Sequence, residues 1–330
     1  GALSAVSDAS FTIERGEFFG LVGESGCGKS TIVKALIGGL DQNGQITSGE
    51  VKYKGETIRQ GDGNTSIDVS SDLGWTDISW IPQASMNSLD PIERIDEQAV
   101  EIAQEHTDMS ESDIIDRLKE MFEIVGVPPS RVSDYPHQFS GGMKQRALIA
   151  MALYLDPDLV IADEPITALD VIMQDQVMKY LDRIQDELET SMMLITHDIS
   201  VVFESCEKMA IMHSGQIAET GTVVDLYDSP RHPYSILLQG AFPDHRYPNR
   251  TLEVIEGEPP QQYGEVTACT FASRCPWAEE ECRTSKPELE PIDEGPNTDA
   301  QYVSCHRKDE IQTLREEEQR DHDATTEADL

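Results

Sequence analysis

A glycine-rich stretch near the N-terminus has the residue types of a phosphate-binding loop. It reads Gly23-Glu24-Ser25-Gly26-Cys27-Gly28-Lys29-Ser30. Glycines let successive backbone N–H groups curl around an anion, and the N-terminus of a following helix adds partial positive charge. Lys29 would reach the β- and γ-phosphates of a nucleotide, and the Ser30 hydroxyl would hold Mg²⁺. A simple turn between a strand and a helix is the alternative, but the Lys-Ser ending between an apolar run and a helical run favours nucleotide binding.

Two carboxylates directly follow a second apolar run, Leu159–Ala162. Asp163, at the end of a buried strand, can reach the Mg²⁺ shell beside Ser30. Glu164 can accept a proton from an attacking water and act as a general base. The alternative is that both carboxylates are simply solvated in a loop. The glycine loop earlier in the chain favours a role for them in nucleotide chemistry.

Ser140-Gly141-Gly142 and His197 are further candidates. Ser140 can cap a helix whose first N–H groups face outward, which is either an ordinary helix start or an anion site. His197 follows the apolar strand 192–196. A lone histidine in that position is more often structural than catalytic.

The elements that position these residues alternate between strand and helix, which indicates a parallel α/β sheet. We expect strands at 18–22, 75–83, 159–162 and 192–196, and helices at 31–37, 92–125, 141–154 and 171–189. Ser110-x-x-Asp113 is a capping box inside the second helical region. Residues 49–58 resemble a strand pair, residues 1–17 alternate as in strands, and residues 60–74 form a surface loop.

Composition excludes several classes of protein. The 330 residues carry a net charge of −37, from 25 basic and 62 acidic residues, so nucleic acid is not an expected partner. With 38% hydrophobic residues the chain folds nonetheless, and its acidic surface leads us to expect a halophilic source. The apolar run 147–155 is too short for a bilayer, and no signal peptide opens the chain. We therefore expect a cytosolic protein, peripheral to a membrane only through a partner, with its six cysteines reduced.

The order of the motifs resembles that of ATP-binding cassette (ABC) ATPases over residues 3–225. Phe139–Arg146 resembles the signature motif and Leu159–Pro165 the Walker B motif, while Gln83, Ala168-Leu169-Asp170 and Thr196-His197-Asp198 match the Q-loop, the D-loop and the switch histidine. The resemblance implies a P-loop NTPase fold with a RecA-like core, an antiparallel β subdomain and an α-helical subdomain at about 84–140. No aromatic residue precedes Phe11, so none is assigned to stack on adenine.

This resemblance implies a complete set of site residues. They are the ATP-binding Gly23, Ser25, Gly26, Cys27, Gly28, Lys29, Ser30 and Thr31, the Mg²⁺-binding Ser30, Gln83 and Asp163, the catalytic Glu164 and His197, the signature residues Ser140, Gly141, Gly142 and Gln145, and Asp170 of the D-loop. In the family the signature acts on ATP bound by the opposite subunit. A second ABC ATPase subunit, identical or homologous, is therefore an expected partner, together with ATP and Mg²⁺.

The C-terminal part resembles that of dipeptide, oligopeptide and nickel importer ATPases, through His232-Pro233-Tyr234 and the run 85–91. Cys269, Cys275, Cys282 and Cys305 follow, with five, six and 22 residues between successive members. Four thiolates suit either zinc or an iron–sulfur cluster. The wide spacing resembles the [4Fe–4S] site of some peptide importers, and reduced cysteines packed as small hydrophobic residues are the alternative.

We therefore predict an ABC nucleotide-binding domain at 1–229, a C-terminal module with a four-cysteine metal site at 230–306 and an acidic disordered tail at 307–330. The predicted activity is ATP hydrolysis that powers peptide import, with two transmembrane permease subunits and, indirectly, an extracellular solute-binding protein as partners. An importer of nickel or another small solute is the first alternative. A soluble, non-transport ABC ATPase is the second, although the chain has no tandem cassette, long coiled-coil insert or basic surface.

Overall fold

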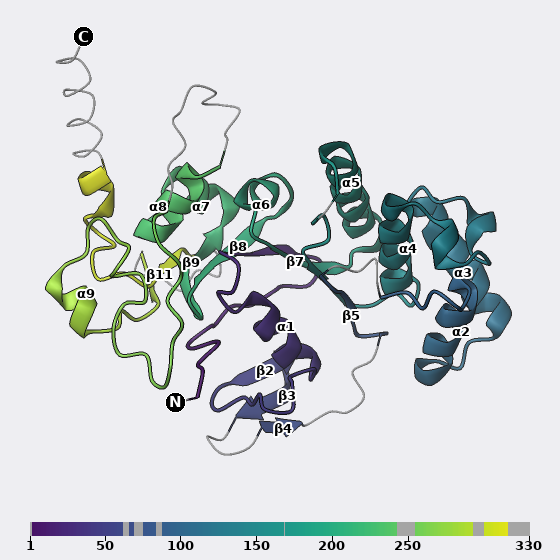
Figure 1. Ribbon diagram of the computed structural model, residues 1–330, viewed down its shortest axis with the longest axis horizontal. Coiled ribbons are helices and arrows are strands. Elements are labelled where there is room, and N and C mark those ends of the chain that lie inside the picture. The colour runs from purple at the N-terminus through teal and green to yellow at the C-terminus, as the bar shows by residue number, and fades with distance from the viewer. Residues whose placement is uncertain are drawn as a thin grey trace, which may run out of the picture. The chain divides into compact units, whose positions relative to one another are not determined.

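The computed structural model describes residues 2–61, 66–68, 75–83, 88–167, 169–242, 255–292 and 300–315 (Figure 1). The chain divides into two compact units, and each is described by itself. The first comprises residues 1–12, 20–29 and 196–330, and the second comprises residues 13–19 and 30–195. Strand β1 (Phe18–Val22) begins in the second unit and ends in the first.

The second unit contains a parallel sheet with the strand order β1-β7-β6-β5. Strand β5 pairs with β6 and β6 with β7, all in parallel, and every residue of β7 is buried. Parallel strands that are covered on both faces have continuous apolar sequences, and this pattern allowed these strands to be predicted. The strand bounds are β5 Ile78–Ile81, β6 Leu159–Asp163 and β7 Ser191–Thr196. Strand β5 is therefore shorter than the predicted 75–83.

A small antiparallel sheet, β2-β3-β4, belongs to the same unit. Its strands are β2 Glu50–Tyr53, β3 Glu56–Gly61 and β4 Ser66–Asp68. The predicted strand pair turning at Lys54-Gly55 is confirmed by β2 and β3. The predicted loop at 60–74 is partly wrong, because residues 66–68 pair with β3 as a third strand. The rest of that segment lies outside the described residues, apart from Gln60 and Gly61, which end β3.

The second unit also contains several helices, of which α2, α3 and α4 pack together (Figure 1). Ser110 caps α3 by accepting a hydrogen bond from the Asp113 N–H, which is one half of the predicted capping box, while the Asp113 carboxylate accepts from the Ser110 hydroxyl. Two short 3₁₀ turns, Pro129–Arg131 and Pro136–Gln138, lead from α3 to α4. The helix bounds are α1 Lys29–Ile37, α2 Ile95–His106, α3 Glu111–Ile124, α4 Gly141–Leu153 and α5 Val171–Leu188.

The first unit carries strands in the order β10-β11-β9-β8-β1, with antiparallel pairing from β10 to β8. These strands are β8 Lys208–His213, β9 Gln216–Thr222, β10 Glu290–Pro291 and β11 Tyr302–Val303. Because β11 pairs with β9, the residues predicted as a separate C-terminal module share a sheet with the cassette residues before them. The helices are α6 Ile199–Ser205, α7 Val223–Asp228, α8 Pro233–Gly240 and α9 Glu280–Thr284.

The N-terminal residues do not form the strands predicted for 1–17. Leu3 makes an isolated bridge with Tyr263, and the Ser7 N–H donates to the carbonyl oxygen of Gly215. Isolated hydrogen bonds with two separate loops, around Tyr263 and at Gly215, pair part of this backbone without forming a ladder. Among the helices of the described part of the chain, none has the length and apolarity needed to cross a bilayer.

Candidate functional site

The glycine loop lies between the buried strand β1 and helix α1, in the arrangement predicted for phosphate binding. A Cβ on Gly23 would lie 2.1 Å from the carbonyl oxygen of Met212, so no other residue fits there. Gly28 has a φ of +111°, and its Cβ would lie 2.5 Å from the carbonyl oxygen of Ala5. Close backbone packing and a left-handed conformation therefore both require glycine in this loop.

Lys29 is held against the loop that it follows. Its Nζ donates to the carbonyl oxygens of Gly23 at 2.6 Å and Glu24 at 3.0 Å, and the residue is 6% exposed. Cys27 is buried beside it, with 3.9 Å between Sγ and Nζ. Burial raises the pKa of the Cys27 thiol, while the charge of Lys29 opposes that shift. The ammonium group thus lies inside the loop, where phosphate oxygens would meet it, and Cys27 fills space as a neutral thiol.

Exposure differs among the other loop residues. Ser25 and Gly26 are exposed, while Ser30 and Thr31 lie half-buried in the first turn of α1. Exposed backbone next to a helix N-terminus is what an anion needs. The binding role of each of these residues remains a prediction.

Glu164 and Gln83 come together in the second unit. The Gln83 amide donates to Glu164 Oε2 at 3.2 Å, and the Thr167 hydroxyl donates to the same oxygen at 2.7 Å. Glu164 has a φ of +49°, a left-handed conformation that is uncommon for a residue with a side chain. Its N–H donates to the carbonyl oxygen of Ile195 at 2.8 Å, which fixes the backbone in this conformation. Local strain of this kind gathers at functional sites.

Asp163 ends β6 and is 2% exposed, opposite Ile195 in the register of β7. A carboxylate is buried in this way only when it is paired or coordinates a cation. Its position directly before Glu164 matches the predicted Mg²⁺ role, which the structure leaves as a prediction.

The predicted signature and D-loop residues begin two neighbouring helices. Ser140 caps α4 by accepting from the Met143 N–H at 3.4 Å, and Asp170 caps α5 by accepting from the Met173 N–H at 3.0 Å. A Cβ on Gly142 would lie 2.3 Å from the Cε of Met173, so the two helix starts touch through glycine. Ser140 and Gly141 are exposed, as an intersubunit contact would require, whereas Gln145 is 4% exposed and directs its side chain inward.

His197 is exposed in the first unit, directly after β7 and before Asp198, which caps α6. The predicted nucleotide residues are thus divided between the units. The glycine loop through Lys29 and His197 belong to the first unit, and Ser30, Thr31, Gln83, Asp163, Glu164, the signature residues and Asp170 belong to the second.

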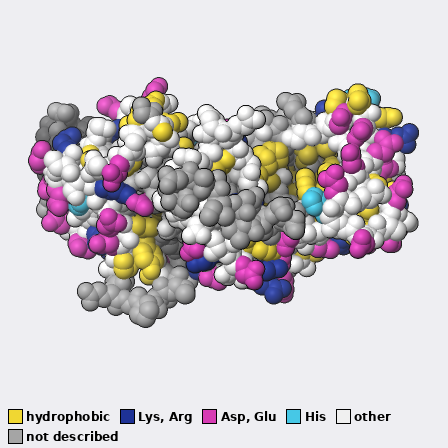
Figure 2. Space-filling view, turned by 90° about the horizontal axis from the view of Figure 1, so that it is seen from below, with side chains coloured by type: hydrophobic (Ala, Val, Ile, Leu, Met, Phe, Trp, Pro, Cys, Tyr) yellow, Lys and Arg dark blue, Asp and Glu magenta, His cyan; other side chains and the backbone are white. Residues whose placement is uncertain are grey.

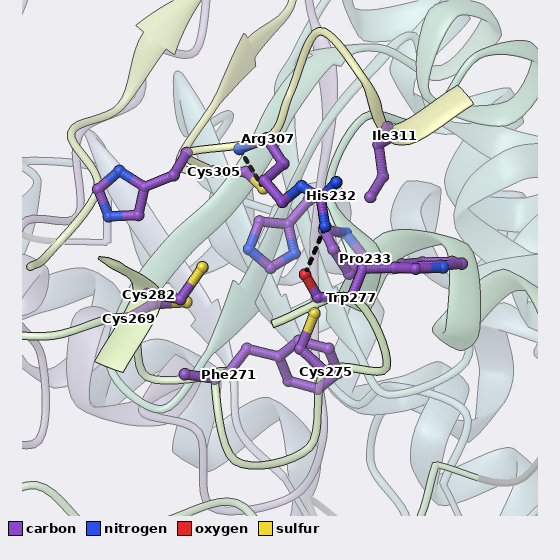
Figure 3. A pocket seen from close by; sticks show the side chains of 12 residues that line it. His232, Pro233, Cys269, Phe271, Cys275, Trp277, Cys282, Cys305, Arg307 and Ile311 are labelled. Atoms are coloured by element: carbon purple, nitrogen blue, oxygen red, sulfur yellow. Dashed lines mark hydrogen bonds between the residues drawn. The ribbon is translucent and has the colours of Figure 1, made fainter. Parts of the chain in front are cut away.

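All four predicted cysteine ligands line one pocket, together with His232, Phe271 and Trp277 (Figure 3). Burial raises the thiol pKa of Cys269, and it raises the pKa of both Cys275 and Cys305 to about 12. Neutral thiols are expected here unless a cation offsets the cost of burying thiolates. Within the described residues, no three His, Cys, Asp or Glu side chains converge closely enough to hold a metal ion. The donor set therefore has the chemistry of a thiolate centre but is not gathered around a single ion.

The sequence did not reveal the residues that hold the His232-Pro233-Tyr234 segment. Glu219 of β9 is completely buried and accepts from the N–H groups of Arg231 at 2.7 Å and His232 at 3.0 Å, and from the Gln301 amide at 2.6 Å. Burial raises the pKa of Glu219, and these donors oppose the shift. The polar sequence of β9, QIAETGT, gave no signal that Glu219 is buried.

Comparison with known proteins identifies the family. The model of the ABC transporter family matches residues 6–167, and the model of the oligopeptide/dipeptide transporter C-terminal region matches residues 218–282. The oligopeptide transport ATP-binding protein OppD of Escherichia coli is 40% identical over 289 residues, which cover 87% of this chain and 84% of that protein. The chain belongs to the ABC transporter ATP-binding family.

Other members of the family extend this likeness over nearly the whole chain. The probable peptide ABC transporter ATP-binding protein y4tR of Sinorhizobium fredii is 37% identical over 314 residues, which cover 94% of this chain and 91% of that protein. The ABC cassette MJ0796, solved as a dimer in a post-hydrolysis state with ADP and Pi, shares 25% identity and a TM-score of 0.56. That match covers 66% of this chain and 90% of the cassette, and it supports the predicted P-loop fold.

Proposed function

We propose that this ABC ATPase hydrolyses ATP to power the import of dipeptides or oligopeptides through a membrane permease. The observation that carries the proposal is its likeness to peptide transport ATP-binding proteins over both the cassette and the C-terminal region. The cassette motifs account for hydrolysis, and the likeness of the C-terminal region to oligopeptide/dipeptide transporters is our reason for proposing peptide as the cargo. Nickel or another small solute is the alternative cargo, because the permease and the binding protein select it.

The site residues divide the chemistry between them. Lys29 and the N–H groups of residues 23–31 bind the phosphates, and Ser30, Gln83 and Asp163 hold Mg²⁺, which neutralises charge on the phosphate oxygens. Glu164 accepts the proton of the attacking water, in an orientation fixed by Gln83 and Thr167. His197 donates a hydrogen bond to the γ-phosphate.

Hydrolysis requires a second ABC subunit. Ser140, Gly141 and Gly142 are placed at an exposed helix start, and we propose that their N–H groups contact the γ-phosphate held by the partner. Asp170 begins the adjacent helix and contributes to the same interface. The pair of cassettes then binds two transmembrane permease subunits at the cytoplasmic side of the membrane, and a solute-binding protein delivers the cargo from outside.

The test is to purify the chain with the permease subunits that associate with it, identify them by mass spectrometry and place the complex in lipid vesicles. ATP hydrolysis is then measured with solute-binding protein loaded with a dipeptide, with an oligopeptide or with Ni²⁺. Stimulation by a peptide alone supports the proposal, and stimulation by Ni²⁺ alone replaces it with the alternative. Full hydrolysis by the chain without any permease would instead indicate a soluble, non-transport ATPase.

We further propose that the four cysteines bind a [4Fe–4S] cluster. Cys269, Cys275, Cys282 and Cys305 line one pocket with an apolar wall, and thiolates around a shared cavity suit a cluster better than one tetrahedral ion. Anaerobic purification followed by iron, sulfide and zinc analysis separates the possibilities. Four irons per chain with visible charge-transfer absorbance support the cluster, and one zinc per chain supports the alternative.

The acidic surface underlies the proposal of a halophilic source. Figure 2 shows Asp and Glu side chains spread widely over the face it presents, with fewer Lys and Arg. A net charge of −37 destabilises a compact chain by self-repulsion unless salt screens it. The free energy of unfolding should therefore rise between low salt and molar KCl.

A further inference from the structure

The glycine loop is tied by an ion pair to residues 269–282, which carry three of the four pocket cysteines and are called the cysteine segment below. The guanidinium of Arg274 binds both oxygens of Glu24, with 2.7 Å from Nη1 to Oε2 and 2.8 Å from Nη2 to Oε1. The Arg274 side chain is 5% exposed and that of Glu24 is 23% exposed. Paired hydrogen bonds fix the relative orientation of the two groups, and salt screens such a shielded pair only weakly.

Both partners are held from other directions as well. The Glu24 N–H donates to the Tyr234 hydroxyl at 3.0 Å, and Arg274 Nε donates to the carbonyl oxygen of Glu256 at 2.9 Å. Arg274 Nη1 also lies 3.2 Å from His213 Nε2. The glycine loop therefore contacts several side chains that form a network, and not Arg274 alone.

Phe271 connects this network to the four-cysteine pocket. The ring of Phe271 lies 5.4 Å from that of Tyr234 and 5.1 Å from that of His213, measured between centroids. Phe271 also lines the pocket beside Cys269 and Cys275 (Figure 3). A change in the packing of this segment is thus transmitted to Arg274, which directly precedes Cys275.

Charge explains why the pair matters for a nucleotide. Glu24 places a carboxylate in a loop whose N–H groups are arranged to hold anions, and an unpaired carboxylate would repel the phosphates. Arg274 neutralises this carboxylate at hydrogen-bond distance. We propose that Arg274 is a positioning residue for the phosphate loop, pairing with Glu24 so that ATP binding depends on the order of the cysteine segment. This inference rests on the proposed function, because it takes the loop to bind ATP.

Coupling between two sites is reciprocal. If the order of the cysteine segment favours ATP binding, then bound ATP must also stabilise that segment. Slower amide hydrogen exchange in residues 269–282 reports such stabilisation without any measurement of hydrolysis.

The experiment compares Mg·ATP affinity in the full chain for the wild type and for Arg274→Gln, Glu24→Gln and the double variant. We expect Arg274→Gln to weaken binding about tenfold, because Glu24 is left unpaired. The double variant should recover to within about threefold of the wild type, because both charges are gone. Arg283→Gln in α9 is the matched control, since it removes an exposed arginine from the same part of the chain.

Hydrogen exchange is the second readout. Mg·ATP should slow exchange in residues 269–282 of the wild type and of Arg283→Gln but not of Arg274→Gln. Arg274→Lys serves if Arg274→Gln does not fold, because lysine keeps the charge but loses the paired geometry, and an intermediate loss of affinity is expected.

Two results would overturn the inference while leaving the proposed function intact. One is wild-type affinity in Arg274→Gln, and the other is a double variant that binds as weakly as Arg274→Gln. A wild-type chain that binds no Mg·ATP would overturn both proposals.

Discussion

Gln83 and Glu164 are joined by a hydrogen bond of 3.2 Å from Nε2 to Oε2. The residues are separated by 81 positions in the chain and lie beyond the ends of the adjacent parallel strands β5 and β6. Gln83 is predicted to bind Mg²⁺ and Glu164 to activate water. Because the two side chains are directly bonded, a movement of Gln83 changes the position of Glu164. Both residues belong to the second unit, so this contact of the proposed catalytic site forms within one unit.

Glu164→Gln should reduce ATP hydrolysis at least 100-fold, because an amide cannot accept the proton of the attacking water. ATP binding should persist, and the variant should accumulate as an ATP-bound dimer on size-exclusion chromatography. Glu189→Gln is the control, since Glu189 is exposed and has nearly the same left-handed backbone, with a φ of +50° against +49°. Retention of most of the wild-type rate by Glu164→Gln would remove this residue from the role of base.

Lys29→Ala should weaken ATP binding by at least tenfold, because it removes the cation that lies within the phosphate loop. Equilibrium titration with a fluorescent ATP analogue measures the effect. Lys34→Ala provides the comparison within α1, because that lysine makes only an exposed pair with Asp41. Equal affinities for the two variants would contradict the assignment of Lys29.

Glu219→Ala should lower the free energy of unfolding by about 3 kcal/mol, because it leaves the N–H groups of Arg231 and His232 without their acceptor. Glu219→Gln keeps one oxygen but turns an NH₂ group toward a donor, so an intermediate loss is expected. Urea denaturation followed by circular dichroism gives the values, with the exposed Glu258→Ala as control. A loss no larger than that of the control would show that other groups satisfy this backbone.

His213 should make stability depend on pH. Burial, followed by the charge of Arg274, lowers its pKa from 6.5 to about 3. Between these values the unfolded chain binds a proton that the folded chain does not. The contribution of His213 is therefore complete above pH 6.5 and declines toward pH 3, by up to about 1.4 kcal/mol per pH unit.

Urea titrations between pH 7 and pH 4 test this expectation by comparing the wild type with His213→Gln. The variant should show a shallower loss of unfolding free energy on acidification. His106→Gln, at an exposed position in α2, should keep the wild-type slope. Identical slopes for all three proteins would mean that His213 gains its proton in the folded state as readily as in the unfolded one.

Local patterns were enough to predict most of the elements. The buried strands β1, β6 and β7 appear as uninterrupted apolar runs, and Ser110, Ser140 and Asp170 cap their helices as their residue types favour. Where prediction was wrong, pairing with another segment of the chain decided the outcome. Residues 66–68 became a strand only because β3 offers an edge, and residues near Leu3 stayed irregular because single loops satisfy their backbone.

The sequence alone determined the chemistry of the phosphate loop, the order of the cassette motifs and the four thiols, because these depend on residue type and short spacing. The tertiary structure alone decided which distant groups meet. Gln83 contacts Glu164, Glu219 holds the segment around His232, and Arg274 binds Glu24 across 250 positions of the chain. Such contacts follow from how strands and loops pack in three dimensions, and no local pattern of residues records them.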